Sequence, residues 1–105
     1  MNFFTALADP TRANIISMLS QNERLSVAAI TSHFEMSAPA VSQHLKVLRI
    51  AKLVNVEVSA QQRFYSLNLT GIKEVENWFK EIRNSWEDLN NRLFDFLENQ
   101  GDENE

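Results

Sequence analysis

The chain of 105 residues contains no cysteine, which excludes disulfide bonds, thiolate metal sites and thiol redox sensing. It has only two glycines and two prolines, and this scarcity favours helices over turn-rich sandwiches and barrels. Glycines at 71 and 101 cannot form a phosphate-binding glycine motif. Because no apolar run approaches the roughly 18 residues of a membrane span, and no signal peptide begins the chain, we expect a cytoplasmic protein without membrane insertion.

Positive charge is also in short supply, since the formal net charge is −4. Residues 70–105 carry four basic and ten acidic groups, whereas residues 37–69 carry Lys46, Arg49, Lys52 and Arg63 against Glu57 alone. The central segment is therefore the only positive part of the chain. If the protein binds a nucleic acid, this segment is expected to meet the phosphates.

Three helix starts can be recognised in the first half of the chain. Asp9-Pro10 predicts a helix to about residue 21, with a shorter helix before it. Ser26 is expected to cap a helix over about 26–35, and Ser37 one over about 37–51. Val41, Leu45 and Leu48 recur at helical spacing and predict the buried side of this third helix.

After Lys52 the apolar period changes from that of a helix to that of a strand. Residues 53–58 and 63–69 alternate between apolar and polar, and residues 59–62 connect them, so a β-hairpin is expected. The connection lacks the Asn-Gly signal of a tight hairpin. Thr70 is expected to cap a last helix. The fold class is therefore mainly α with a β-hairpin wing (α+β), a winged helix-turn-helix.

The last helix carries an unbroken heptad pattern of apolar residues. About 28 residues give a length of roughly 42 Å, more than the roughly 30 Å breadth of a domain of this size, so a second copy is expected to cover it. The alternative is that the helix packs only on its own core. We predict one domain over 1–98 and a flexible acidic tail over 99–105. The predicted dimer interface consists of Phe3, Phe4, Leu7, Phe79, Ile82, Trp86, Leu89 and Leu93.

Two helices joined by a short turn and followed by a hairpin are typical of DNA-binding proteins. With Val41 and Leu45 facing the core, Ser42 and Gln43 are placed to read base edges, and Lys46 to reach a phosphate. The alternative is an ordinary solvent-facing surface helix. His44 is interpreted as a hydrogen-bonded structural residue. No arrangement of Ser, His and Asp suits nucleophilic catalysis, so an enzyme is not expected.

Three stretches carry a resemblance to a known family: ALADPTRANIISMLS at 6–20, SAPAVSQHLKVLRIAKLV at 37–54 and RFYSLN at 63–68. They resemble the ArsR/SmtB family of bacterial winged-helix repressors. The resemblance implies a homodimer built from the first and last helices, an operator of two-fold symmetry, a base-reading helix at 38–50 and a wing at 55–66. The predicted DNA-binding residues are Ser37, Ala38, Pro39, Ser42, Gln43, Lys46, Arg49, Gln61, Gln62 and Arg63.

The chain departs from the metal-sensing members of that family. Their Cys-x-Cys motif is replaced here by Ser26-Val27-Ala28, and the last helix has no histidine ligand. We therefore expect no metal and no cofactor, and a place in the metal-independent branch of small autorepressors. The expected partners are double-stranded DNA, a second copy, and an effector protein or small-molecule inducer. Two alternatives remain: a protein-interaction module with weak DNA binding, or a small-molecule sensor with a pocket near Trp78 and Trp86.

Overall fold

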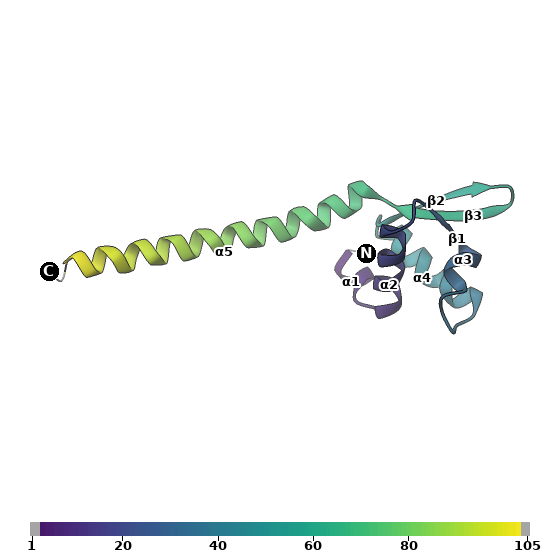
Figure 1. Cartoon of the computed structure of the whole chain (residues 1–105), viewed down its shortest axis with the longest axis horizontal. Helices are drawn as coiled ribbons and strands as arrows, with labels where there is room; N and C mark the ends of the chain where they lie inside the picture. Colours follow the sequence, from purple (N-terminus) through teal and green to yellow (C-terminus); the bar gives the residue numbers. More distant parts are fainter. Residues whose placement is uncertain (1–2, 104–105) are drawn as a thin grey trace. The chain divides into compact units, whose positions relative to one another are not determined.

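The computed structural model describes residues 3–103. Its elements, in chain order, are α1 (Phe3–Leu7), α2 (Pro10–Ser20), β1 (Leu25–Ser26), α3 (Val27–Thr31), α4 (Ala38–Ile50), β2 (Val54–Ser59), β3 (Gln62–Leu67) and α5 (Leu69–Glu103) (Figure 1). The chain divides into two units, with the boundary between Lys73 and Glu74. The predicted mainly helical fold with a small antiparallel wing is confirmed.

The helix starts predicted from Asp9, Ser26 and Ser37 are confirmed. The side chain of Asp9 accepts a hydrogen bond from the backbone N–H of Arg12 at 3.1 Å, with Pro10 in the first position of α2. Ser26 caps α3 and Ser37 caps α4 in the same way. In each case the cap satisfies a backbone N–H that the helix itself leaves without a partner.

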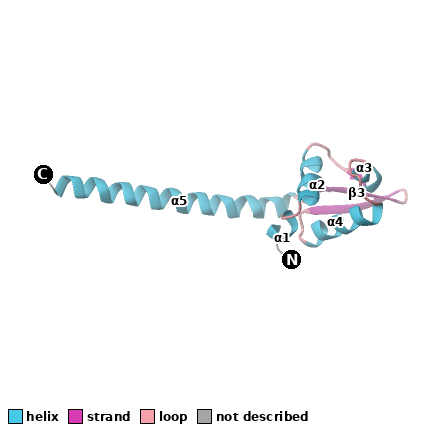
Figure 2. Ribbon diagram, turned by 90° about the horizontal axis from the view of Figure 1, so that it is seen from below, coloured by secondary structure: helices cyan, strands magenta, loops and turns pink. Residues whose placement is uncertain are grey.

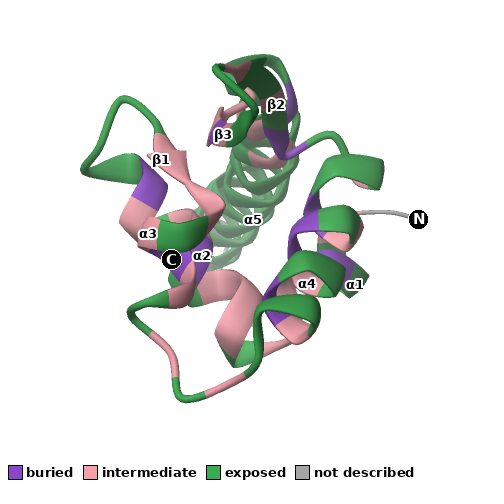
Figure 3. Cartoon of the chain, turned by 90° about the vertical axis from the view of Figure 1, so that its right-hand side faces the viewer, coloured by how far each residue is buried: buried purple, intermediate pink, exposed green. Residues whose placement is uncertain are grey.

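The core of the first unit lies between α2, α3, α4 and the inner face of the sheet. Figure 3 shows the buried positions of α4 on the side turned toward the other elements, with the exposed positions on its outer side. The predicted stripe of α4, consisting of Val41, Leu45 and Leu48, is fully buried. The other buried apolar residues are Ala6, Ile15, Leu19, Ile30, Leu53, Val54 and Tyr65.

Within the described residues, the sheet has three antiparallel strands in the order β1-β3-β2. Figure 2 draws the strands in magenta, with β3 labelled. The prediction missed β1, because a strand of two residues has no alternation to recognise. The connection between β2 and β3 is tighter than expected, since Ser59 pairs with Gln62 across a turn of only Ala60 and Gln61. Both turn residues have positive φ (49° and 67°), the conformation that the two-residue turn requires even without glycine.

Two predicted helix boundaries were wrong. Helix α3 ends at Thr31 rather than near residue 35, because the N–H groups of His33 and Phe34 bond to carbonyls three residues earlier, which tightens the chain into turns. Helix α5 begins at Leu69, and its cap is Asn68 rather than Thr70, since Asn68 Oδ1 accepts from the N–H groups of Thr70 and Gly71.

Helix α5 also continues past residue 98, where the predicted tail begins, as far as Glu103. The single glycine at 101 costs only about 1 kcal/mol of helix propensity, which is too little to end a helix by itself. Residues 104 and 105 lie outside the described residues. The domain boundary at 98 and the flexibility of the tail stay predictions.

The end of α4 is held by a left-handed residue that is not glycine. Lys52 has φ of 63°, its N–H donates to the carbonyl of Arg49, and the N–H of Leu53 donates to the carbonyl of Leu48. These two bonds form a Schellman motif. Gly71 in the first turn of α5 lies so close to this motif that a Cβ on it would be 1.9 Å from the carbonyl oxygen of Lys52.

The substitution Lys52→Gly is expected to raise the free energy of unfolding by up to about 1 kcal/mol. A residue with a Cβ is strained in the left-handed region, and glycine relieves that strain at the cost of a more flexible unfolded chain. Urea denaturation followed by circular dichroism measures the change. Lys52→Ala, which keeps the strain and removes the charge, is the control, and an equal gain from that variant would contradict the explanation.

The second unit is the long helical part of α5 from Glu74 onward. Along its described residues, ion pairs join side chains four positions apart: Lys80 with Glu76, Arg83 with Glu87, and Arg92 with Asp88. Phe79 and Trp86 are 59% and 61% exposed. No helix within residues 3–103 is long and apolar enough to cross a membrane.

Candidate nucleic-acid interface

Helix α4 separates a fully buried side from a polar outer side. Ser42, Gln43 and Lys46 are exposed, while their neighbours Val41 and Leu45 are buried. Arg49 is exposed in the last turn of the helix, and so are Ala38 and Pro39 in its first turn. The outer face therefore offers small residues at the helix start, amide and hydroxyl groups in the middle and cations toward the end.

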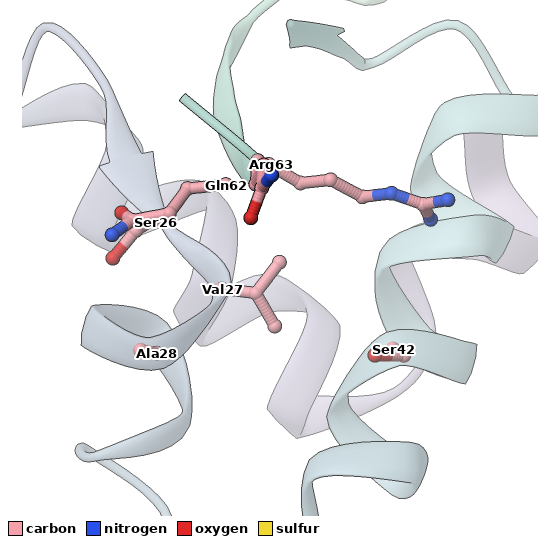
Figure 4. A pocket seen from close by; sticks show the side chains of 7 residues that line it. Ser26, Val27, Ala28, Ser42, Gln62 and Arg63 are labelled. Atoms are coloured by element: carbon pink, nitrogen blue, oxygen red, sulfur yellow. The ribbon is translucent and has the colours of Figure 1, made fainter. Parts of the chain in front are cut away.

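A groove of about 440 Å³ lies between the start of α3, the outer side of α4 and the tip of the hairpin. Figure 4 shows the side chain of Arg63 extending toward α4, where Ser42 lies on the opposite wall. Arg63 pairs in register with Val58, on the sheet face that also carries Val56 and Tyr65. The residues lining the groove are Ser26, Val27, Ala28, Ser42, Gln61, Gln62 and Arg63.

The one acidic side chain of the central segment is held on the other face of the hairpin. Glu57 pairs in register with Phe64 and lies 3.9 Å from the guanidinium of Arg24. Arg24 also lies over the ring of Phe64, at 4.2 Å from its centroid. Because the Glu57 carboxylate has a cationic neighbour and points away from the groove, it does little to oppose an anion approaching Arg63.

A polar cluster connects α4 to the start of α2. Arg12 Nη1 lies 3.2 Å from His44 Nδ1, and the carboxylate of Asp9 lies 3.8 Å from the same nitrogen. The backbone N–H of Arg12 lowers the pKa of Asp9 from its ordinary value, and His44 contributes in the same direction. The interpretation of His44 as a hydrogen-bonded residue is confirmed, with Arg12 of α2 as its partner.

The structure therefore brings the predicted DNA-binding residues to two neighbouring places, the outer side of α4 and the hairpin tip. All ten are exposed. Sequence reasoning missed Val58, which is 68% exposed beside Arg63. It also missed Arg24 and the link between Arg12 and His44. The predicted interface residues on α5 are exposed, as is Phe4, whereas Phe3 and Leu7 are half-buried.

A helix-turn-helix followed by an antiparallel hairpin defines a winged helix, a class of DNA-binding domain. Comparison with known proteins gives the family. Residues 9–56 match the model of the bacterial regulatory protein arsR family. The transcriptional repressor SdpR of Bacillus subtilis is 34% identical over 83 residues, which cover 79% of this chain and 91% of SdpR. The chain belongs to the ArsR family.

Other relatives agree on the class but differ in what their names say of transcription. The transcriptional activator HlyU of Vibrio cholerae is 46% identical over 70 residues, covering 67% of this chain and 64% of HlyU. A crystal structure of an ArsR family transcriptional regulator matches with a TM-score of 0.73 at 27% identity, covering 80% of this chain and 86% of that one. The family consists of DNA-binding transcriptional regulators, not of enzymes, and the present protein is one of them.

Proposed function

We propose that the protein is a homodimeric repressor that binds an operator of two-fold symmetry, with α4 of each copy in successive major grooves about 34–36 Å apart. The observation that carries this proposal is the contrast between the two sides of α4. Its apolar stripe is fully buried, and its outer face presents exposed polar and basic side chains next to Arg63. Such a repressor acts in the cytoplasm.

The residues of this surface take different roles in the proposal. Ser42 and Gln43 read base edges, with glutamine favouring adenine. Ala38 and Pro39 let the first turn approach the groove closely, and the N–H groups beyond the Ser37 cap face a phosphate. Lys46 and Arg49 contact the backbone. At the wing, Gln61, Gln62 and Arg63 reach the flanking DNA.

The dimer in this proposal is formed by the first and last helices. Large apolar side chains recur every three or four residues along the exposed face of α5, and leaving them in water is costly. A hollow on α5 is lined by Glu81, Ile82, Ser85, Trp86 and Leu89. Because one helix supplies all of these walls, we interpret the hollow as part of the dimer face rather than as a ligand pocket. Phe3, Phe4 and Leu7 add to the interface.

Regulation in the proposed repressor does not use a metal or a thiol. The sequence offers no cysteine, and the groove position where metal sensors of the family carry Cys-x-Cys is occupied by Ser26, Val27 and Ala28. Of the two histidines, His44 is bonded to Arg12, and His33 lies beside the carbonyl of Ala29. The signal that releases DNA is therefore an effector protein or a small organic inducer.

The test is a set of binding titrations on the DNA upstream of the protein's own coding region, after footprinting has located the site. If each copy neutralises four phosphates, log K against log salt is expected to slope at roughly −7. Ser42→Ala and Gln43→Ala should each lose about tenfold or more in preference for the site over random DNA. Lys46→Ala should weaken both DNAs alike and make the slope shallower by roughly 2, because one phosphate contact is lost in each copy. Identical behaviour of the three variants would contradict the assigned roles.

The modest positive charge of the proposed DNA-binding surface favours a second function. Residues 37–69 carry a net charge of only +3, and Val58 is an exposed apolar side chain at the wing. Both features suit a dimeric module that docks a protein through its hairpin. Normal dimerisation with no binding to its own upstream DNA, even at low salt, would favour this function over the first.

A further inference from the structure

One side chain, that of Arg12, joins three helices of the first unit. Its Nε donates to the carbonyl of Ala6 at 2.6 Å and its Nη2 to the carbonyl of Thr5 at 3.2 Å. Both carbonyls belong to α1, a helix of five residues that is too short to be stable alone. The remaining nitrogen, Nη1, lies 3.2 Å from His44 Nδ1 on α4. The planar guanidinium of Arg12 thus connects α1 to α4, the proposed base-reading helix.

The direction of the last hydrogen bond decides the protonation state of the histidine. Arginine stays protonated and can only donate, so His44 Nδ1 must accept, and its proton must be on Nε2. A second proton on His44 would turn Nδ1 into a donor and set two cations against each other. The carboxylate of Asp9, 3.8 Å away, would then be the better partner. The cluster therefore has two arrangements, which differ in whether α4 is tied to Arg12.

Few other charges bear on this cluster. Helix α1 has no ionisable side chain, Arg12 is the only ionisable residue of α2, and α3 has none. Glu57 of β2 is paired with Arg24. On α4 itself, the other ionisable residues are Lys46 and Arg49.

We propose that Arg12 is a positioning residue for DNA recognition, which sets the reading helix against α1 through neutral His44. His44 directly follows Ser42 and Gln43, so the bond that holds its ring also fixes the turn of α4 that reads base edges. The inference rests on the proposed function in one respect, because α1 is taken as part of the dimer interface. Through Arg12, a change at that interface reaches the reading helix of the same copy.

The first experiment compares Arg12→Lys with Arg12→Gln in titrations on the footprinted site. Lysine keeps the charge but cannot span Thr5, Ala6 and His44 with a rigid fork. If Arg12 positions α4, both variants should lose about tenfold in affinity, and the salt slope should keep its wild-type value. If Arg12 instead binds a phosphate, Arg12→Lys should bind almost as the wild type does, and Arg12→Gln should make the slope shallower by roughly 2, one contact being lost in each copy. That result would overturn the proposal.

A second readout does not involve DNA. Hydrogen exchange of the peptide covering α1 should be faster in Arg12→Lys, because two of the bonds that hold that helix are lost. Unchanged protection of α1 would contradict the proposed tie. This measurement also separates the inference from the proposed function, since it keeps its meaning if the protein fails to bind its upstream DNA.

The third experiment changes His44 itself. His44→Gln keeps an amide oxygen that can accept from Arg12, whereas His44→Lys places a cation next to Arg12 and makes Asp9 its better partner. If Arg12 sets α4 through this bond, His44→Gln should bind the footprinted site almost as the wild type does, and His44→Lys should lose about tenfold. His33→Lys, at the other histidine, is the matched control and should not lose affinity.

The His44 variants decide the matter even if the Arg12 variants do not fold, because they test the same bond from its other end. Wild-type affinity in His44→Lys would overturn the inference, and so would an equal loss in His44→Gln and His44→Lys.

Discussion

Replacing Trp86 by glutamate is expected to convert the proposed dimer into a monomer and to lower the operator affinity by more than about 100-fold. Trp86 lies midway along the apolar face of α5 and is 61% exposed in the single chain. A buried tryptophan removes roughly 150–250 Å² from water, and burying an unpaired carboxylate in its place is strongly unfavourable. We expect a loss of about 2–3 kcal/mol in each copy, which weakens dimerisation by roughly a thousandfold.

Analytical ultracentrifugation measures the mass, and a titration on the footprinted site measures the affinity. Asn84→Glu is the matched control, because it adds the same charge on the polar side of the same helix and should leave the dimer intact. Circular dichroism should show the winged-helix unit still folded in the Trp86 variant. A dimer of wild-type stability would contradict the proposed interface, whatever happens to DNA binding.

Replacing Gly71 by alanine is expected to lower the free energy of unfolding by about 3 kcal/mol. The added Cβ would lie 1.9 Å from the carbonyl oxygen of Lys52 and 2.9 Å from its carbonyl carbon, and backbone atoms cannot move aside as a flexible side chain can. The nearby backbone is held further by the hydrogen bond from Asn68 N–H to the carbonyl of Leu53 at 2.9 Å. The start of α5 must therefore shift away from the end of α4.

Urea denaturation monitored by circular dichroism gives the change in stability. Gly101→Ala, the same substitution at the only other glycine, should be neutral or should stabilise the helix by up to about 1 kcal/mol. A loss below about 1 kcal/mol in Gly71→Ala would show that the two segments can separate at little cost. The close approach of Gly71 to Lys52 would then not hold α5 in place.

Much of the fold was predictable because its signals are local. Asp9 and Ser37 cap helices by accepting from N–H groups three residues away, so both partners are visible in one short stretch of sequence. The buried stripe of α4 follows directly from the helical period. The same period correctly placed Ser42, Gln43 and Lys46 on the exposed side of α4, since residues outside the stripe must point outward.

The features that were missed depend on residues far apart in the chain. Strand β1 exists only because Leu25 pairs with Tyr65, and two residues have no periodicity of their own. The left-handed turn at Ala60 and Gln61 is imposed by the pairing of the strands on either side. Thr70 was a reasonable cap by residue type, but Asn68 takes that place because its carboxamide oxygen can reach two N–H groups at once.

The sequence by itself determined the helix order, the wing, the family resemblance and the split of charge between a positive centre and an acidic last helix. Only the tertiary structure decided that Arg63 and Ser42 face one groove, that Glu57 is turned away from it, and that Arg12 reaches His44 across 32 positions. The physical reason is the distance along the chain over which each kind of interaction acts. Capping and periodicity act over a few residues, whereas a groove or a shared guanidinium depends on how the packed core brings distant segments together.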